Sequence, residues 1–81
     1  MKNFKELSKT VQMINKSVES FGYEFYSIDM RRREVMLQGH YSSEVVMTLQ
    51  LDYHSKANVN TNGFIGFNFK LDDVDVTITL T

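Results

Sequence analysis

The clearest pattern in the chain lies in residues 65–81, which read IGFNFKLDDVDVTITLT. Apolar residues occupy every second position on both sides of an Asp-Asp dipeptide, and this alternation is typical of two half-buried β-strands. The apolar positions are Ile65, Phe67, Phe69, Leu71, Val74, Val76, Ile78 and Leu80. A two-residue turn at Asp72-Asp73 pairs Leu71 with Val74 and places both apolar sets on one face. The sequence therefore predicts a β-hairpin with one buried face.

Residues 4–21 carry a helical period instead. Apolar residues recur there at intervals of three and four, which confines them to one side of an α-helix. They are Phe4, Leu7, Val11, Ile14, Val18 and Phe21. Asn3 and Glu6 form a capping-box pattern at the start, and Gly22 suits a left-handed position after the last turn. We expect an amphipathic helix that begins near Asn3 and ends at Phe21.

Two strands are predicted directly after this helix, over residues 23–30 and 34–41. They flank Arg31-Arg32-Arg33, and β-branched and aromatic residues are frequent in both. A turn centred on Arg31 and Arg32 would pair Ile28 with Val35 and match apolar to apolar residues across the hairpin. We expect a second antiparallel pair here.

Residues 45–53 read VVMTLQLDY, and every second residue from Val45 to Tyr53 is apolar. We interpret this alternation as another strand, which brings the expected number to five. Residues 54–62 form the longest connection, and the other connections are short enough to favour antiparallel neighbours. The expected fold is a single α+β domain over residues 1–81. Its N-terminal helix packs on a mostly antiparallel sheet of about five strands, with the last strand at an edge.

Composition excludes several classes of protein. The 81 residues suffice for one small core, and the absence of cysteine excludes a disulfide scaffold or a thiolate metal centre. A net charge of −1 supplies no bulk attraction to nucleic acid or to an anionic membrane. The longest apolar runs cannot span a bilayer, and the first residues lack the apolar region of a signal peptide. We therefore expect a cytoplasmic protein without membrane contact.

Catalytic chemistry is not predicted, because the candidate side chains do not converge. His40 and His54 lie at opposite ends of the hairpin that residues 34–53 would form, nearly one strand length apart. Asp72, Asp73 and Asp75 occupy a turn and a polar strand face with no further ligands nearby, and we interpret them as solvated carboxylates. We expect no enzymatic activity, no metal and no cofactor.

Two basic clusters support an alternative hypothesis, that of nucleic-acid binding. The first is a stripe on the helix made of Lys2, Lys5, Lys9 and Lys16. The second is the predicted turn at Arg31, Arg32 and Arg33, where guanidinium groups can bind phosphate in bidentate fashion. A solvated helix face and turn arginines paired with nearby carboxylates explain the same residues without a ligand.

The leading functional hypothesis rests on apolar residues assigned to the sheet face that the helix does not cover. A solvated face is normally polar, so large apolar residues on it indicate a contact surface. These residues are Tyr23, Phe25, Met36, Val46 and Phe64. We expect a non-enzymatic binding or regulatory module that docks its sheet face or edge onto a protein, with a second copy in a homodimer as one such partner. An inhibitor that a phage directs against a host defence system is one form of this hypothesis.

Overall fold

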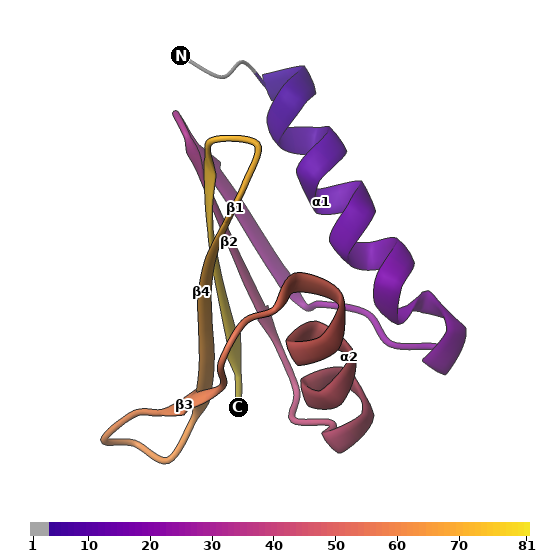
Figure 1. Ribbon diagram of the computed structural model, residues 1–81, viewed down its shortest axis with the longest axis vertical. Coiled ribbons are helices and arrows are strands. Elements are labelled where there is room, and N and C mark those ends of the chain that lie inside the picture. Colours follow the sequence, from indigo (N-terminus) through magenta and orange to yellow (C-terminus); the bar gives the residue numbers. More distant parts are fainter. Residues whose placement is uncertain (1–3) are drawn as a thin grey trace.

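The computed structural model describes residues 4–81, and it confirms the α+β class. Helix α1 (Phe4–Val18) runs into a 3₁₀ turn, η1 (Glu19–Phe21), which strands β1 (Ser27–Arg31) and β2 (Glu34–Gly39) follow. Helix α2 (Ser43–Tyr53) comes next, before strands β3 (Asn58–Val59), β4 (Ile65–Leu71) and β5 (Val74–Leu80). Both helices lie on the same side of the sheet, so its other face is open (Figure 1). Neither helix of residues 4–81 is long and apolar enough to cross a bilayer.

Helix α1 forms where its apolar period predicts it. The four middle residues of the predicted face are buried, namely Leu7, Val11, Ile14 and Val18. Phe4 and Phe21, at the two ends of the pattern, are exposed instead. Gly22 takes the left-handed conformation with φ of 69°, and its N–H donates to the Glu19 carbonyl and ends the helical segment. The predicted Asn3 cap lies outside the described residues.

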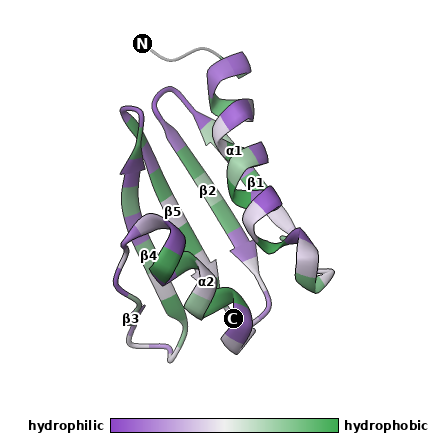
Figure 2. Cartoon of the chain, turned by 45° about the vertical axis from the view of Figure 1, so that its right-hand side comes forward, coloured by the Kyte–Doolittle hydropathy of each residue, from purple (hydrophilic) through white to green (hydrophobic). Residues whose placement is uncertain are grey.

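The β4–β5 hairpin has the predicted register. Leu71 pairs with Val74 across a two-residue turn, and Asp72 and Asp73 both have positive φ, at 47° and 67°. Two successive left-handed residues are the signature of a type I′ turn, whose twist matches that of the flanking strands. The apolar residues of β5 are all buried, and hydropathy alternates along the strands (Figure 2). The predicted position of the turn is therefore confirmed, although neither turn residue is the glycine that is common in type I′ turns.

The β1–β2 hairpin forms with a register two residues away from the predicted one. Ile28 lies opposite Leu37 rather than Val35, because the turn is at Arg32-Arg33 and not at Arg31-Arg32. Arg32 adopts the positive φ of 35° that this turn requires. A shift of two residues keeps every side chain on its own face, so the apolar matching survives the error.

Residues 45–53 form a helix, and the prediction of a strand there is wrong. The Ser42 hydroxyl caps α2 by accepting a hydrogen bond from the Val45 N–H at 3.4 Å. Val45 and Leu49, one helical turn apart, are buried against the sheet, whereas Met47 and Leu51 point away from it. Apolar residues on opposite sides of one helix produced the alternation that imitates a strand.

The sheet order is β1-β2-β5-β4-β3, with β2 and β5 parallel and the other pairs antiparallel. Strand β5 therefore lies at the centre of the sheet, and the prediction that it forms an edge is wrong. The short connections suggested that strands adjacent in the sequence would pair. Instead, α2, β3 and β4 lie between β2 and β5 in the sequence, and β5 of the β4–β5 hairpin pairs with β2. Strands β1 and β3 are the two edges.

One apolar layer fills the space between the helices and the sheet. Its fully buried members are Ile14, Val18, Val35, Leu37, Val45, Leu49, Phe67, Val74, Val76, Ile78 and Leu80. Tyr53, at the end of α2, stacks on Phe69 with ring centroids 4.9 Å apart. Its hydroxyl lies 2.8 Å from the Ser17 hydroxyl and donates to the Met13 carbonyl of α1. Burial raises the pKa of the Tyr53 phenol above its ordinary value. This residue joins both helices to the sheet.

Removing the central ring of this layer tests the assignment of faces. Phe67→Ala should lower the free energy of unfolding by about 3–5 kcal/mol, because the ring is fully buried. Thr79→Ala, on the open face, should cost about 1 kcal/mol at most. Urea denaturation followed by circular dichroism measures both. Equal losses would mean that the buried face is assigned wrongly.

Candidate functional site

The five residues predicted as one contact surface do not lie on one surface. Tyr23 and Phe25 belong to the segment between η1 and β1, Val46 lies on α2 and packs partly against the core, and Phe64 precedes β4. Met36 lies on the open face of the sheet. Its row across the sheet is otherwise polar, from Asp29 on β1 through Thr77 and Asn68. The open face is that of a solvated sheet, so the premise of the prediction fails there.

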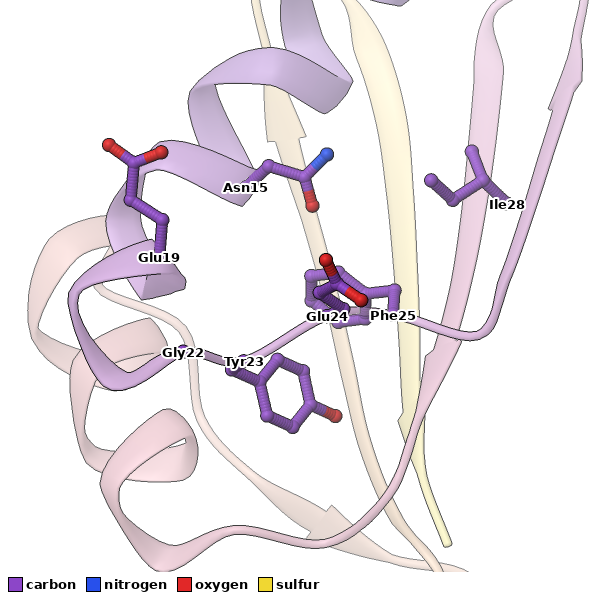
Figure 3. Close-up of a pocket in the computed structure, with 7 residues that line it drawn as sticks. All are labelled: Asn15, Glu19, Gly22, Tyr23, Glu24, Phe25 and Ile28. Carbon is purple, nitrogen blue, oxygen red and sulfur yellow. The ribbon is translucent and has the colours of Figure 1, made fainter.

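Tyr23 and Phe25 do come together, at a groove between α1 and β1. Their rings make an edge-to-face contact with centroids 5.2 Å apart. The groove encloses about 430 Å³ and is lined by Asn15, Glu19, Gly22, Tyr23, Glu24, Phe25 and Ile28. Figure 3 shows Asn15 reaching into this space from the helix and Ile28 from the opposite wall. The Gly22 turn makes the groove by sending the chain from the end of α1 back toward the sheet.

Tyr23 is held in place at the base of this groove. Its hydroxyl donates to the His40 carbonyl at 2.7 Å, which ties the segment before β1 to the end of β2. The ring lies over Gly39, where any Cβ atom would overlap the phenol oxygen. Burial, and to a lesser extent the neighbouring Tyr26, raise the pKa of the Tyr23 phenol. The neutral hydroxyl is therefore the form that serves as a hydrogen-bond donor here.

The charged groups lining the groove are both acidic. Glu19 comes from η1 and Glu24 from the segment before β1, and neither has an ion-pair partner within residues 4–81. Ile28, on the inner face of β1, remains 43% exposed because α1 packs mainly over β2 and α2. The groove thus combines an apolar wall with two unpaired carboxylates.

The structure shows a second surface that the sequence did not predict. Met47 and Leu51 are 63% and 71% exposed on the side of α2 that faces solvent. They are four residues apart, so they lie side by side on the helix. The outward side of a surface helix is normally polar. The i, i+4 spacing of these two residues, in addition to that of Val45 and Leu49, is the signal that could have revealed a helix with two apolar sides.

The two basic clusters differ in their surroundings. Lys5, Lys9 and Lys16 are exposed on α1, and Lys2 lies outside the described residues. The turn at Arg31–Arg33 lies beside the turn at Asp72-Asp73, because β2 and β5 pair in parallel. The Asp75 N–H donates a hydrogen bond to the Arg33 carbonyl. This end of the sheet carries the cations Arg31, Arg32, Arg33 and Lys70 and the carboxylates Asp29, Glu34, Asp72, Asp73 and Asp75. The arginine turn is therefore not part of a basic patch.

The two histidines are not neighbours. His40 follows β2, and the centroid of its ring lies 4.9 Å from that of Tyr26. His54 ends α2 in a left-handed conformation. Within residues 4–81, no three histidine or carboxylate side chains are grouped closely enough to hold a metal ion.

Comparisons with known proteins add no relationship. No protein-family model, curated protein or solved structure matches this chain.

The contact between Tyr23 and Gly39 can be tested with a double-mutant cycle. Gly39→Ala should lower the free energy of unfolding by about 1–3 kcal/mol, because the new methyl group displaces the Tyr23 ring. In a Tyr23→Ala background the same substitution should cost much less, since the overlap is gone. Chemical denaturation of the wild type, the two single variants and the double variant gives the coupling free energy between residues 23 and 39. Gly66→Ala is the control, because its Cβ would meet backbone oxygens only at ordinary distances. Additive effects at residues 23 and 39 would contradict the placement of Tyr23.

Proposed function

We propose that the protein is a non-catalytic protein-binding module whose main contact surface is the outward side of α2. The observation that carries this proposal is the exposure of Met47 and Leu51, side by side on one helix. Full burial of each side chain by a partner would contribute about 1.5–3 kcal/mol to the free energy of binding. Within residues 4–81, both side chains remain mostly exposed. The predicted contact through the open sheet face has less support, because that face is polar.

The chemistry of this surface fits recognition by a helix lying in a groove. Apolar anchors at i and i+4 are the pattern by which an amphipathic helix enters a hydrophobic groove on a partner. Methionine adapts its shape to irregular surfaces, and leucine fills a defined pocket. Glu44, one turn before Met47, is exposed and supplies a polar margin. A module of this kind acts by occupying a surface of its partner, which is the mode of action that the inhibitor hypothesis requires.

Nucleic-acid binding remains the alternative, with weaker support. The lysines of α1 stay exposed, but the carboxylates beside Arg31–Arg33 reduce the attraction of that end for phosphate. If phosphate contacts exist, an electrophoretic shift with DNA or RNA should appear at about 50 mM salt and disappear in Lys5→Glu/Lys9→Glu.

Two charges on α2 test the protein-binding proposal. Met47→Glu/Leu51→Glu should leave circular dichroism unchanged and alter the free energy of unfolding by about 0.5 kcal/mol or less per site, because both side chains face solvent. The double variant should lose self-association in sedimentation velocity, or lose partners that the wild-type bait retains, because a charge buried without a partner is costly.

The matched control is Gln12→Glu/Gln38→Glu, which adds the same charge at exposed positions on α1 and β2. The control should keep the oligomeric mass and the partners of the wild type. If the α2 variant also keeps both, the outward side of α2 is not the contact surface.

A further inference from the structure

We propose a second binding site, separate from α2: the groove between α1 and β1 takes an extended peptide segment that adds to β1 as a sixth strand and carries a lysine or arginine. The site does not depend on the function proposed for α2. Three features support it, namely the free edge of β1, the open space beside that edge, and the charge that lines this space.

The edge of β1 is available for main-chain pairing. Strand β1 ends the sheet order and is hydrogen-bonded on one side only, to β2. Natural edge strands are commonly protected by proline, bulges or charged residues. The chain has no proline, and the two charged side chains of β1, Asp29 and Arg31, bond each other at 3.0 Å and lie on the open face. The inner-facing residues of β1, Ile28 and Met30, are apolar, so the strand presents no charge to a segment arriving under α1.

The space beside this edge suits the side chains of such a segment. An added strand would lie about 4.8 Å from β1, and its inward-pointing residues would enter the layer between sheet and helix. The groove of about 430 Å³ occupies that layer, with Asn15 on the helix side and Ile28 on the strand side (Figure 3). Its volume falls within the range of about 300–1,000 Å³ that is usual for ligand clefts. Strand addition between an edge strand and a helix is an established mode of peptide recognition.

The charge lining the groove selects the residue that enters it. Glu19 and Glu24 have no ion-pair partner within residues 4–81, and no cation lines the groove. The two carboxylates lie apart in the groove (Figure 3), so a guanidinium or ammonium group that enters it is attracted by both and donates a charge-assisted hydrogen bond to one of them. The aliphatic stem of a lysine or arginine would pack on Ile28 and Phe25, and its cationic head can also approach the aromatic rings of Phe25 and Tyr23. An acidic or apolar residue in the same position would leave the carboxylates unpaired. The occupant is therefore a basic extended segment.

The experiment uses four labelled octapeptides of alternating threonine and valine that differ only in one central residue, which is lysine, arginine, glutamine or glutamate. Binding is measured by fluorescence anisotropy and by amide shifts in ¹⁵N-resolved NMR spectra. The lysine and arginine peptides should bind about tenfold more tightly than the glutamine peptide or better, and should shift the amides of Ser27–Arg31. Methylation of alternate backbone nitrogens in the lysine peptide should abolish binding, because it removes main-chain donors.

Glu19→Gln/Glu24→Gln should remove the preference for lysine over glutamine and keep the β1 shifts. Glu44→Gln/Asp52→Asn, which removes the same charge from α2, should leave the preference intact. The proposal is overturned if no peptide shifts the β1 amides, if all four bind equally to the wild type, or if the groove variant keeps the preference. Concentration-dependent shifts of the β1 amides without peptide would also overturn it, since a second copy would then be the occupant.

Discussion

The parallel pairing of β2 with β5 is the constraint on which the remaining arrangement depends. Parallel neighbours cannot be joined by a tight turn, so the chain needs a long excursion between them. Helix α2 and strands β3 and β4 lie in that excursion, and α2 buries Val45 and Leu49 on the same side of the sheet as α1. The pairing also places β5 between β2 and β4. Strand β5 is therefore hydrogen-bonded on both sides, and its whole apolar face is buried.

The parts of the fold that local chemistry determines could be predicted. The 3-4 spacing of α1, the Gly22 stop and the Leu71–Val74 register all depend on residues close in the sequence. The order of strands could not be predicted, because it depends on which apolar faces meet across long separations. Helix α2 was misread for a more specific reason. Met47 and Leu51 on its outward side complete an alternation with Val45 and Leu49, so that one pattern satisfies both periods.

The same two residues link the structural error to the functional proposal. In a helix that served only the core, the positions of Met47 and Leu51 would be polar, and the sequence would read unambiguously as a helix. Of the residues predicted for the contact surface, only Tyr23 and Phe25 lie together, and they do so beside an edge rather than on the open face. The sequence could not show this, because the groove depends on the Gly22 turn, on Gly39 beneath the Tyr23 ring, and on how far α1 extends over β1. The adjacency of Arg33 and Asp75 was equally invisible before the sheet order was known.

A nuclear Overhauser spectrum of the uniformly labelled protein tests this arrangement most directly. Parallel pairing of β2 with β5 predicts cross-strand contacts that link Val35 to Val76 and Leu37 to Ile78, together with strong sequential amide–amide contacts through residues 43–53. Cross-strand contacts between residues 45–53 and 34–39, with no contacts between β2 and β5, would contradict it. In that case residues 45–53 would be a strand, and Met47 and Leu51 would no longer form an outward pair on a helix.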